Sequence, residues 1–169
     1  MKKIFAVIIS VLFLFSGCTA AENTKEPSSS GTDQVKSVWM TYFELEQFTS
    51  SSETAQDFEE KIKEAFKIIL DTGLNAVTVQ VRPCADAFYQ SEYFPVSQYC
   101  FGTQGSELKY DPLEIMVIAA HDLGLRIEAW INPYRVSQSN DINELSNDNP
   151  AKIWYQNEDT KSNVYISDK

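Results

Sequence analysis

The chain has 169 residues, enough for one domain, and its 24 acidic side chains against 14 lysines and arginines give a net charge of −10. Its 43% hydrophobic and 22% charged residues are typical of a globular protein and exclude global disorder. The acidic balance argues against nucleic acid as a partner, because nucleic-acid binding usually needs a basic face. One histidine and three cysteines are too few for a closed zinc site, and we expect neither a metal nor another cofactor.

The amino terminus has the features of an export signal. Lys2 and Lys3 precede an apolar run at residues 4–15. A helix of that length would be about 18 Å long, too short to cross roughly 30 Å of hydrocarbon. Residues 1–17 therefore predict a signal peptide. The run ends in FSGC, which resembles a bacterial lipobox and predicts a lipid on Cys18; the alternative is an ordinary signal followed by a chance cysteine.

Residues 18–36 contain almost no bulky apolar side chain, so they predict a flexible tether. The folded domain is expected at 37–169. If the signal works as read, the protein is exported and anchored by lipid to the outer face of the cell membrane or envelope. Exported proteins can keep disulfides, and Cys84 and Cys100 could form a pair or remain thiols; the sequence leaves both open.

The first half of the domain predicts two strands with a helix between them. Residues 37–45 are rich in aromatic and β-branched side chains and predict a strand. Ser50 and Glu53 are spaced as in a capping box and predict the beginning of a helix, whose apolar stripe covers residues 58–70. Residues 75–82 predict the second strand.

A long loop and a second helix follow. Residues 83–110 predict a loop of a length that is uncommon in compact domains and is often functional. Asp111 and Pro112 predict the beginning of a helix, and residues 126–131 predict the third strand. Beyond it, short helices are expected near 141–146 and 150–156.

The order β-α-β-α-β demands parallel strands with helical crossovers. No G-x-G-x-x-G motif follows the first strand, which weakens a dinucleotide-binding interpretation. The pattern therefore favours a TIM-type (β/α)8 barrel, which in full has eight strands and about 250 residues. Three β/α units predict the first part of an incomplete barrel.

Alternation along the strands separates apolar from polar side chains. The apolar sets, expected to pack against helices, are Val77, Val79 and Val81 in the second strand and Ile127, Ala129 and Ile131 in the third. Polar and aromatic side chains gather at the carboxyl ends of the strands, where barrel enzymes place their chemistry. They are Gln80, Arg82, Asp86, Trp130, Asn132, Tyr134 and Arg135.

Structural roles compete with these functional ones. Arg82 could form a structural ion pair with Asp86 or Glu128, and Trp130 could simply fill the barrel. If Trp130 is exposed, its ring offers a flat apolar face on which sugars stack.

Three further residues are weaker candidates. Glu44 and Glu46 follow the first strand, and at least one of them is expected to be plain surface. His121 is expected to pack near the end of its helix rather than to transfer protons.

Two long segments carry a resemblance to a known family. They are QVRPCADAFYQSEYFPVSQY at 80–99 and YDPLEIMVIAAHDLGLRIEAWINPYR at 110–135. Together with the first strand and the Asn149-Pro150-Ala151 motif, they resemble the glycosyl hydrolase-like 10 family of exported or lipid-anchored bacterial proteins. The resemblance covers about 37–169. It implies a (β/α)8 barrel that cleaves glycosidic bonds, with peptidoglycan glycan or a related polysaccharide as partner and substrate.

The resemblance also implies site residues. By motif match, the sugar cleft is lined by Gln80, Arg82, Asp86, Trp130, Asn132 and Tyr134. Asp86 is the candidate for the catalytic or sugar-contacting carboxylate. Arg82 and Asn132 would hold sugar hydroxyls or acidic substituents. Ala85 departs from the family, which usually has glycine there.

Glycoside hydrolysis generally needs two carboxyl groups. Asp86 is one, and Glu128 or Glu44 are the other candidates in this sequence. The family's acid-rich fourth strand finds no counterpart here, so we expect the amino-terminal portion of a family member, inactive as given. The alternatives are a non-catalytic carbohydrate-binding surface lipoprotein and a fragment that does not fold alone.

Overall fold

A computed structural model describes residues 34–167 of the chain, which divides into two units, Met1–Gln34 and Val35–Lys169. The predicted signal peptide, the lipidation site Cys18 and nearly all of the tether lie outside the described residues. The described elements are β1 (Ser37–Met40), α2 (Tyr42–Ser50), α3 (Ala55–Asp71), β2 (Ala76–Arg82), α4 (Gln98–Phe101), α5 (Pro112–Asp122), β3 (Arg126–Ile131), η1 (Ile142–Glu144), α6 (Pro150–Gln156) and η2 (Lys161–Asn163).

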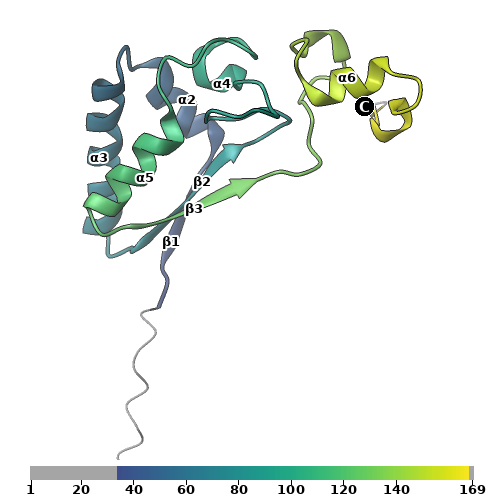
Figure 1. Ribbon diagram of the computed structural model, residues 1–169. Helices are drawn as coiled ribbons and strands as arrows, with labels where there is room; N and C mark the ends of the chain where they lie inside the picture. Colours follow the sequence, from purple (N-terminus) through teal and green to yellow (C-terminus); the bar gives the residue numbers. More distant parts are fainter. Residues whose placement is uncertain (1–33, 168–169) are drawn as a thin grey trace, which may run out of the picture. The chain divides into compact units, whose positions relative to one another are not determined.

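The three strands form one parallel sheet in the order β1-β2-β3, and helices α3 and α5 lie side by side on one face of it (Figure 1). This confirms the predicted alternation of strands and helices. The central strand pairs Val77 with Val38 on one side and with Ile127 on the other. Between Gln80 and Arg82, β2 advances two residues while β3 advances one, so the register shifts near the carboxyl end of the sheet.

The predicted first strand is too long. β1 ends at Met40, and residues 42–50 form helix α2 instead. The cause is a capping box that begins at Thr41, where the Glu44 carboxylate accepts a hydrogen bond from the Thr41 backbone nitrogen at 2.8 Å. Tyr42 and Leu45, three residues apart, then face the core.

The helix expected to begin near Ser50 begins later. Thr54 is the N-cap of α3, and its hydroxyl accepts a hydrogen bond from the Asp57 backbone nitrogen at 3.1 Å. Phe58, Ile62 and Phe66 are its buried stripe, as predicted. The predicted loop at 83–110 is also more ordered than expected, because it contains α4 and a bridge that pairs Ala87 with Val96.

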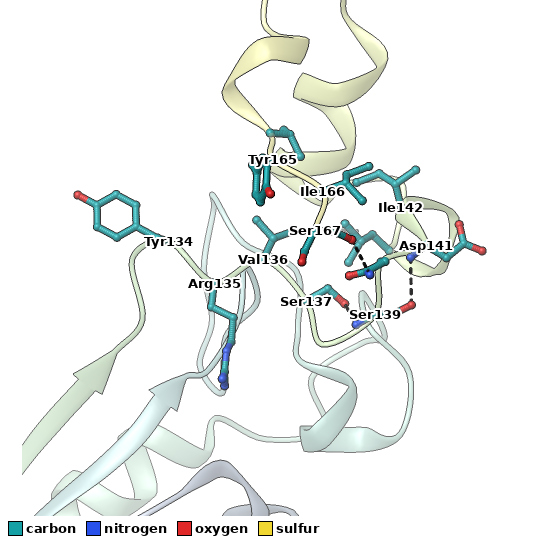
Figure 2. Close-up of a pocket in the computed structure, with 13 residues that line it drawn as sticks. Tyr134, Arg135, Val136, Ser137, Ser139, Asp141, Ile142, Tyr165, Ile166 and Ser167 are labelled. Atoms are coloured by element: carbon teal, nitrogen blue, oxygen red, sulfur yellow. Dashed lines mark hydrogen bonds between the residues drawn. The ribbon is translucent and has the colours of Figure 1, made fainter. Parts of the chain in front are cut away.

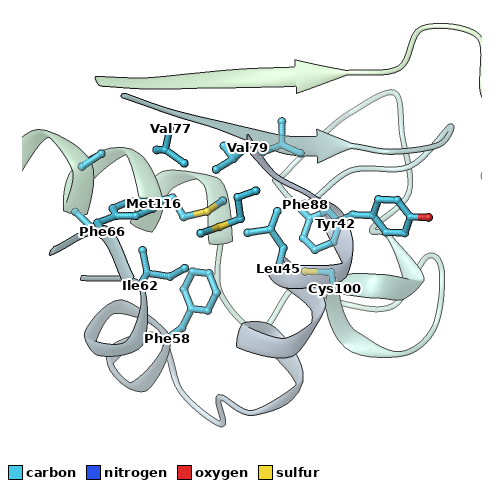
Figure 3. Packing of buried hydrophobic residues seen from close by; sticks show 14 of the residues in the cluster. Tyr42, Leu45, Phe58, Ile62, Phe66, Val77, Val79, Phe88, Cys100 and Met116 are labelled. Atoms are coloured by element: carbon cyan, nitrogen blue, oxygen red, sulfur yellow. The ribbon is translucent and has the colours of Figure 1, made fainter. Parts of the chain in front are cut away.

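The main core lies between the sheet and its helices (Figure 3). The three valines of β2, Val77, Val79 and Val81, are buried in it as predicted. In β3 the prediction holds only for Ile127, which packs against the core. Ala129 and Ile131 are exposed, and β3 is an edge strand of the described sheet. No helix among residues 34–167 has the length and apolar character needed to cross a bilayer.

Candidate functional site

The carboxyl ends of β2 and β3 open into a cleft of about 600 Å³, which we call the aromatic cleft. It is lined by Thr41, Tyr42, Phe43, Gln80, Trp130, Asn132, Pro133, Tyr134 and Arg135. Four of the predicted sugar-contacting residues are therefore brought together here. They converge because parallel strands end at one edge of a sheet, so polar side chains from both strand ends share the same space.

Hydrogen bonds fix the Trp130 ring at the cleft. Its indole nitrogen Nε1 donates to Asn132 Oδ1 at 2.9 Å, and Asn132 Nδ2 donates to the Pro83 carbonyl oxygen at 2.9 Å. The ring also packs against Trp39 of β1, with centroids 5.7 Å apart. Tyr134 is 93% exposed. The cleft thus offers one oriented aromatic face and one freely accessible ring, with the amides of Gln80 and Asn132 beside them.

Asp86 lies in a second hollow of about 310 Å³, the Asp86 pocket. Its lining is polar and comprises Cys84, Asp86, Gln98, Tyr99, Gln104, Val136, Ser137, Gln138, Ser139, Glu144 and Leu145. The backbone on both sides of Asp86 is anchored: Ala85 N–H donates to the Val136 carbonyl at 3.2 Å, and Ala87 N–H donates to the Pro95 carbonyl at 2.9 Å. The sequence grouped Asp86 with the cleft residues, whereas the structure places it in this neighbouring pocket.

The Asp86 carboxyl is 1% exposed. Its Oδ2 accepts a hydrogen bond from Gln104 Nε2 at 3.2 Å, while Oδ1 is buried without a partner in the described part of the chain. Burial raises the pKa of Asp86, and hydrogen bonds from the Ser97 hydroxyl and the Gln104 amide oppose that rise. A carboxyl with a raised pKa is suited to give up a proton to a leaving oxygen.

The two sites meet around Tyr42 of the aromatic cleft, whose ring centroid lies 4.7 Å from that of Tyr99 in the Asp86 pocket. Gln138 of the Asp86 pocket donates a hydrogen bond from Nε2 to the hydroxyl of Tyr42, which lines the aromatic cleft. Burial raises the pKa of Tyr42, with Tyr99 adding to the effect and the positive charge of Arg135 opposing it.

Arg82 does not line the aromatic cleft. Its guanidinium lies over the ring of Phe94, 4.5 Å from the centroid, a distance typical of a cation–π contact. Within the described residues it forms neither of the ion pairs that were considered: no salt bridge joins it to Asp86, and Glu128 pairs with Arg126 at 2.7 Å. The register shift after Gln80 redirects the end of β2 and accounts for the separation of Arg82 from the cleft.

The other acids and the histidine have structural roles or stay at the surface. Glu44 caps α2, and the Thr41 hydroxyl lowers its pKa. His121 lies in the last turn of α5, but it is exposed and does not pack as expected. Glu144 was missed by sequence reasoning, yet it is the other carboxylate that lines the Asp86 pocket.

Cys84 and Cys100 are both free, buried thiols, which answers the open disulfide question. Burial raises the pKa of Cys84 to about 11 and that of Cys100 to about 12, so both are poor nucleophiles. Among residues 34–167, no three histidine, cysteine or acidic side chains are grouped so that they could hold a metal ion.

A third hollow, of about 220 Å³, lies between the segment after β3 and residues 164–167 (Figure 2). It shares Tyr134 and Arg135 with the aromatic cleft. Asn140 Nδ2 donates to the Ser167 carbonyl at 2.7 Å on its other side. Sequence reasoning gave no indication of this hollow, because its walls come from segments without periodic patterns.

Comparisons with known proteins agree with the resemblance. The family model described as glycosyl hydrolase-like 10 matches residues 34–167. Glycosyl hydrolase YngK of Bacillus subtilis (strain 168) is 45% identical over 98 residues, which are 56% of this chain and 19% of YngK. Glycosyl hydrolase DigH of Escherichia coli (strain K12) is 36% identical over 93 residues, which are 52% of this chain and 21% of DigH. The matched segments therefore span about a fifth of the length of these relatives.

Proposed function

We propose that the chain belongs to a cell-envelope glycoside hydrolase, because it is a member of the glycosyl hydrolase-like 10 family. The proposed reaction is hydrolysis of O-glycosyl bonds, with peptidoglycan glycan or a related polysaccharide as substrate. Two relatives are named glycosyl hydrolases, which supports the reaction class. The substrate class is our own step beyond those names.

One observation carries the proposal: the aromatic cleft presents an oriented aromatic surface, and the neighbouring Asp86 pocket holds a buried carboxyl. Trp130 is held by Asn132 at the cleft, and Asp86 is buried with one oxygen free of protein partners among the described residues. Sugar rings stack on flat aromatic faces, and a protonated carboxyl is what a glycosidic oxygen needs in order to leave. A buried carboxyl oxygen without a protein partner costs stability, so its presence among the described residues supports a role for Asp86 beyond packing.

In the proposed mechanism, Asp86 is the general acid. Burial raises its pKa and so favours the protonated form, from which the proton passes to the glycosidic oxygen. A second carboxylate then attacks the sugar or activates water, at about 5–5.5 Å from the acid for retention or 6.5–9.5 Å for inversion. Within the described residues, Glu144 is the carboxylate placed in the same pocket, whereas Glu44 and Glu128 are engaged elsewhere.

The fold and location belong to the same proposal. We assign the parallel sheet and its helices to the first three units of a (β/α)8 barrel, in which the aromatic cleft lies at the catalytic end. We also assign the protein to the outer face of the cell membrane or envelope, held by lipid on Cys18. The intact mass of protein extracted from its native membrane tests this, because an acylated chain beginning at Cys18 has a defined mass. A mass that still includes residues 1–17 would overturn the anchor.

A sugar-release assay tests the hydrolase. The protein from its native membrane is incubated with purified peptidoglycan glycan strands, and new reducing ends are counted. We expect release that Asp86→Asn abolishes, while Asp159→Asn, at an exposed position, leaves it unchanged. Absence of release from every envelope polysaccharide tried would refute the proposal.

The second candidate is a non-catalytic carbohydrate-binding protein. It is favoured by the separation of Asp86 from the lining of the aromatic cleft, since binding needs only the cleft. Titration with soluble glycan separates the two candidates. Binding that Trp130→Ala weakens, without any product, would support the second and exclude the first.

A further inference from the structure

Gln104 is the centre of a hydrogen-bond network that joins two distant segments of the chain. Its Nε2 donates to Asp86 Oδ2 at 3.2 Å. Its Oε1 accepts from the Ser146 backbone nitrogen at 3.0 Å and from Asn149 Nδ2 at 3.2 Å. Fully buried Asn149 also donates from Nδ2 to the Ala85 carbonyl at 2.9 Å. The network therefore returns to the residue before Asp86.

The two ends of the Gln104 amide do different things. The donor end contacts the carboxyl group that the proposed mechanism uses. The acceptor end holds the turn at 146–149, where Asn149 caps α6 by accepting from the Ala151 backbone nitrogen at 3.0 Å. The backbone is tight here as well: Gly105 has a φ of +76°, and a Cβ on it would lie 3.0 Å from the Ser146 Cβ. The segment after β3 is thus seated directly against the residue that holds Asp86.

We infer that Gln104 is a positioning residue for Asp86, which orients the carboxyl at its pocket and ties that orientation to the segment at 146–149. The inference rests on the proposed function for its catalytic meaning, because Asp86 is the acid there. It also makes a prediction that needs no activity. An amide N–H that donates to a carboxylate favours the ionised form, so removing it should raise the pKa of Asp86 further.

Other titratable groups lie around Asp86 and form the electrostatic environment in which its carboxyl titrates. They are Cys84, Tyr99 and Glu144 in the lining of the pocket, Cys100, whose pKa Asp86 helps to raise, and Arg135, which lowers the pKa of Cys84. A substitution at Gln104 alters none of these groups chemically. Gln98 supplies a matched control, because it lines the same pocket and has no hydrogen bond to Asp86 within the described region.

The test uses the full 169-residue chain, labelled with carbon-13 and nitrogen-15 and kept in detergent. The Asp86 carboxyl shift against pH reports the donor end of Gln104. Hydrogen exchange of the Ser146 amide reports the acceptor end, since that N–H donates to Gln104 Oε1. Gln104→Met removes both ends, whereas Gln104→Glu keeps an acceptor oxygen and removes the donor.

In Gln104→Met we expect the pKa of Asp86 to rise by at least about one unit, a ten-fold change in proton affinity, with faster exchange at Ser146. In Gln104→Glu the pKa should rise while Ser146 stays protected. Gln98→Met should change neither. If Gln104→Met does not fold, the wild-type chain decides, because a rise of the pKa in Gln104→Glu also contains the repulsion between two neighbouring carboxylates. The Gln104 side-chain amide shift should then titrate together with the Asp86 carboxyl. An amide shift that is independent of that titration would overturn the inference.

An unchanged pKa of Asp86 in the folded Gln104 variants, or an equal rise in Gln98→Met, would overturn the inference. The sugar-release assay is independent of this outcome. Shifts as expected in a protein that releases no sugar would leave the positioning role standing and remove only the hydrolase.

Discussion

Asp86→Asn should change how the stability of the chain depends on pH. Asp86 is 1% exposed, its Oδ1 has no partner in the described part, and burial raises its pKa. A carboxyl with a higher pKa in the folded than in the unfolded state binds more protons when folded. Its contribution to stability is therefore fully present below the unfolded pKa and is lost as the pH rises through the folded pKa.

The structure sets the size of the effect. Below the unfolded pKa of about 3.9, Asp86 is neutral in both states and resembles asparagine. Above the folded pKa, the folded chain keeps a buried carboxylate with one unpartnered oxygen, and such a group costs about 1–3 kcal/mol. Between acid and neutral pH, we therefore expect the variant to gain about 1–3 kcal/mol in unfolding free energy relative to wild type.

Urea unfolding followed by tryptophan fluorescence, at several pH values between 4 and 8, measures this difference. Asp159→Asn is the control, because Asp159 is exposed and its variant should follow wild type at every pH. A variant that loses stability relative to wild type as the pH rises would refute the reasoning. Such a result would mean that the ionised carboxylate is satisfied in the fold. A gain in stability together with lost activity is the trade-off expected of a functional residue.

Three further changes test separate parts of the structure. Trp130→Ala should weaken glycan binding by at least about 1 kcal/mol, roughly five-fold, in a calorimetric titration, whereas Trp154→Ala, outside the aromatic cleft, should not. Cys100, with a pKa of about 12, should be alkylated at pH 8 roughly a thousand-fold more slowly in the folded chain than in urea; equal rates would contradict its burial. Gly73→Ala should cost about 1–2 kcal/mol for its positive φ in urea unfolding. Gly105→Ala should cost more, because its Cβ would also press on a neighbouring side chain, and equal costs would contradict that packing.

Local patterns predicted much of the fold. The alternating residues of β2 and β3 gave both strands to within one residue, and the Asp111-Pro112 pair gave the beginning of α5, where Asp111 accepts from the Glu114 backbone nitrogen. The error at α2 has a physical cause. Its first residues, Tyr42 and Phe43, are aromatic as in a strand, yet the capping box at Thr41 satisfies the first backbone groups of a helix.

The site was predictable only where it depends on strand ends. Gln80, Trp130 and Asn132 converge because β2 and β3 are parallel neighbours. Arg82 lies outside the lining of the aromatic cleft, and the register shift beside it cannot be seen in the alternation of a single strand. The hydrogen bonds of Gln104 could not be predicted from the sequence, because its partners are 18 to 45 residues away. No residue spacing encodes contacts between irregular segments.

The two proposed functions make different demands on the contact between Gln138 and Tyr42. A general acid must come within about 2.6–3.2 Å of the oxygen that it protonates. Asp86 lies in a pocket whose lining includes Gln138 and Tyr99, and both residues contact Tyr42 of the aromatic cleft, so these contacts lie between the two hollows. Hydrolysis therefore requires the contact to open, or the glycan to occupy both hollows at once. Binding requires neither, because the aromatic cleft is complete with the contact closed.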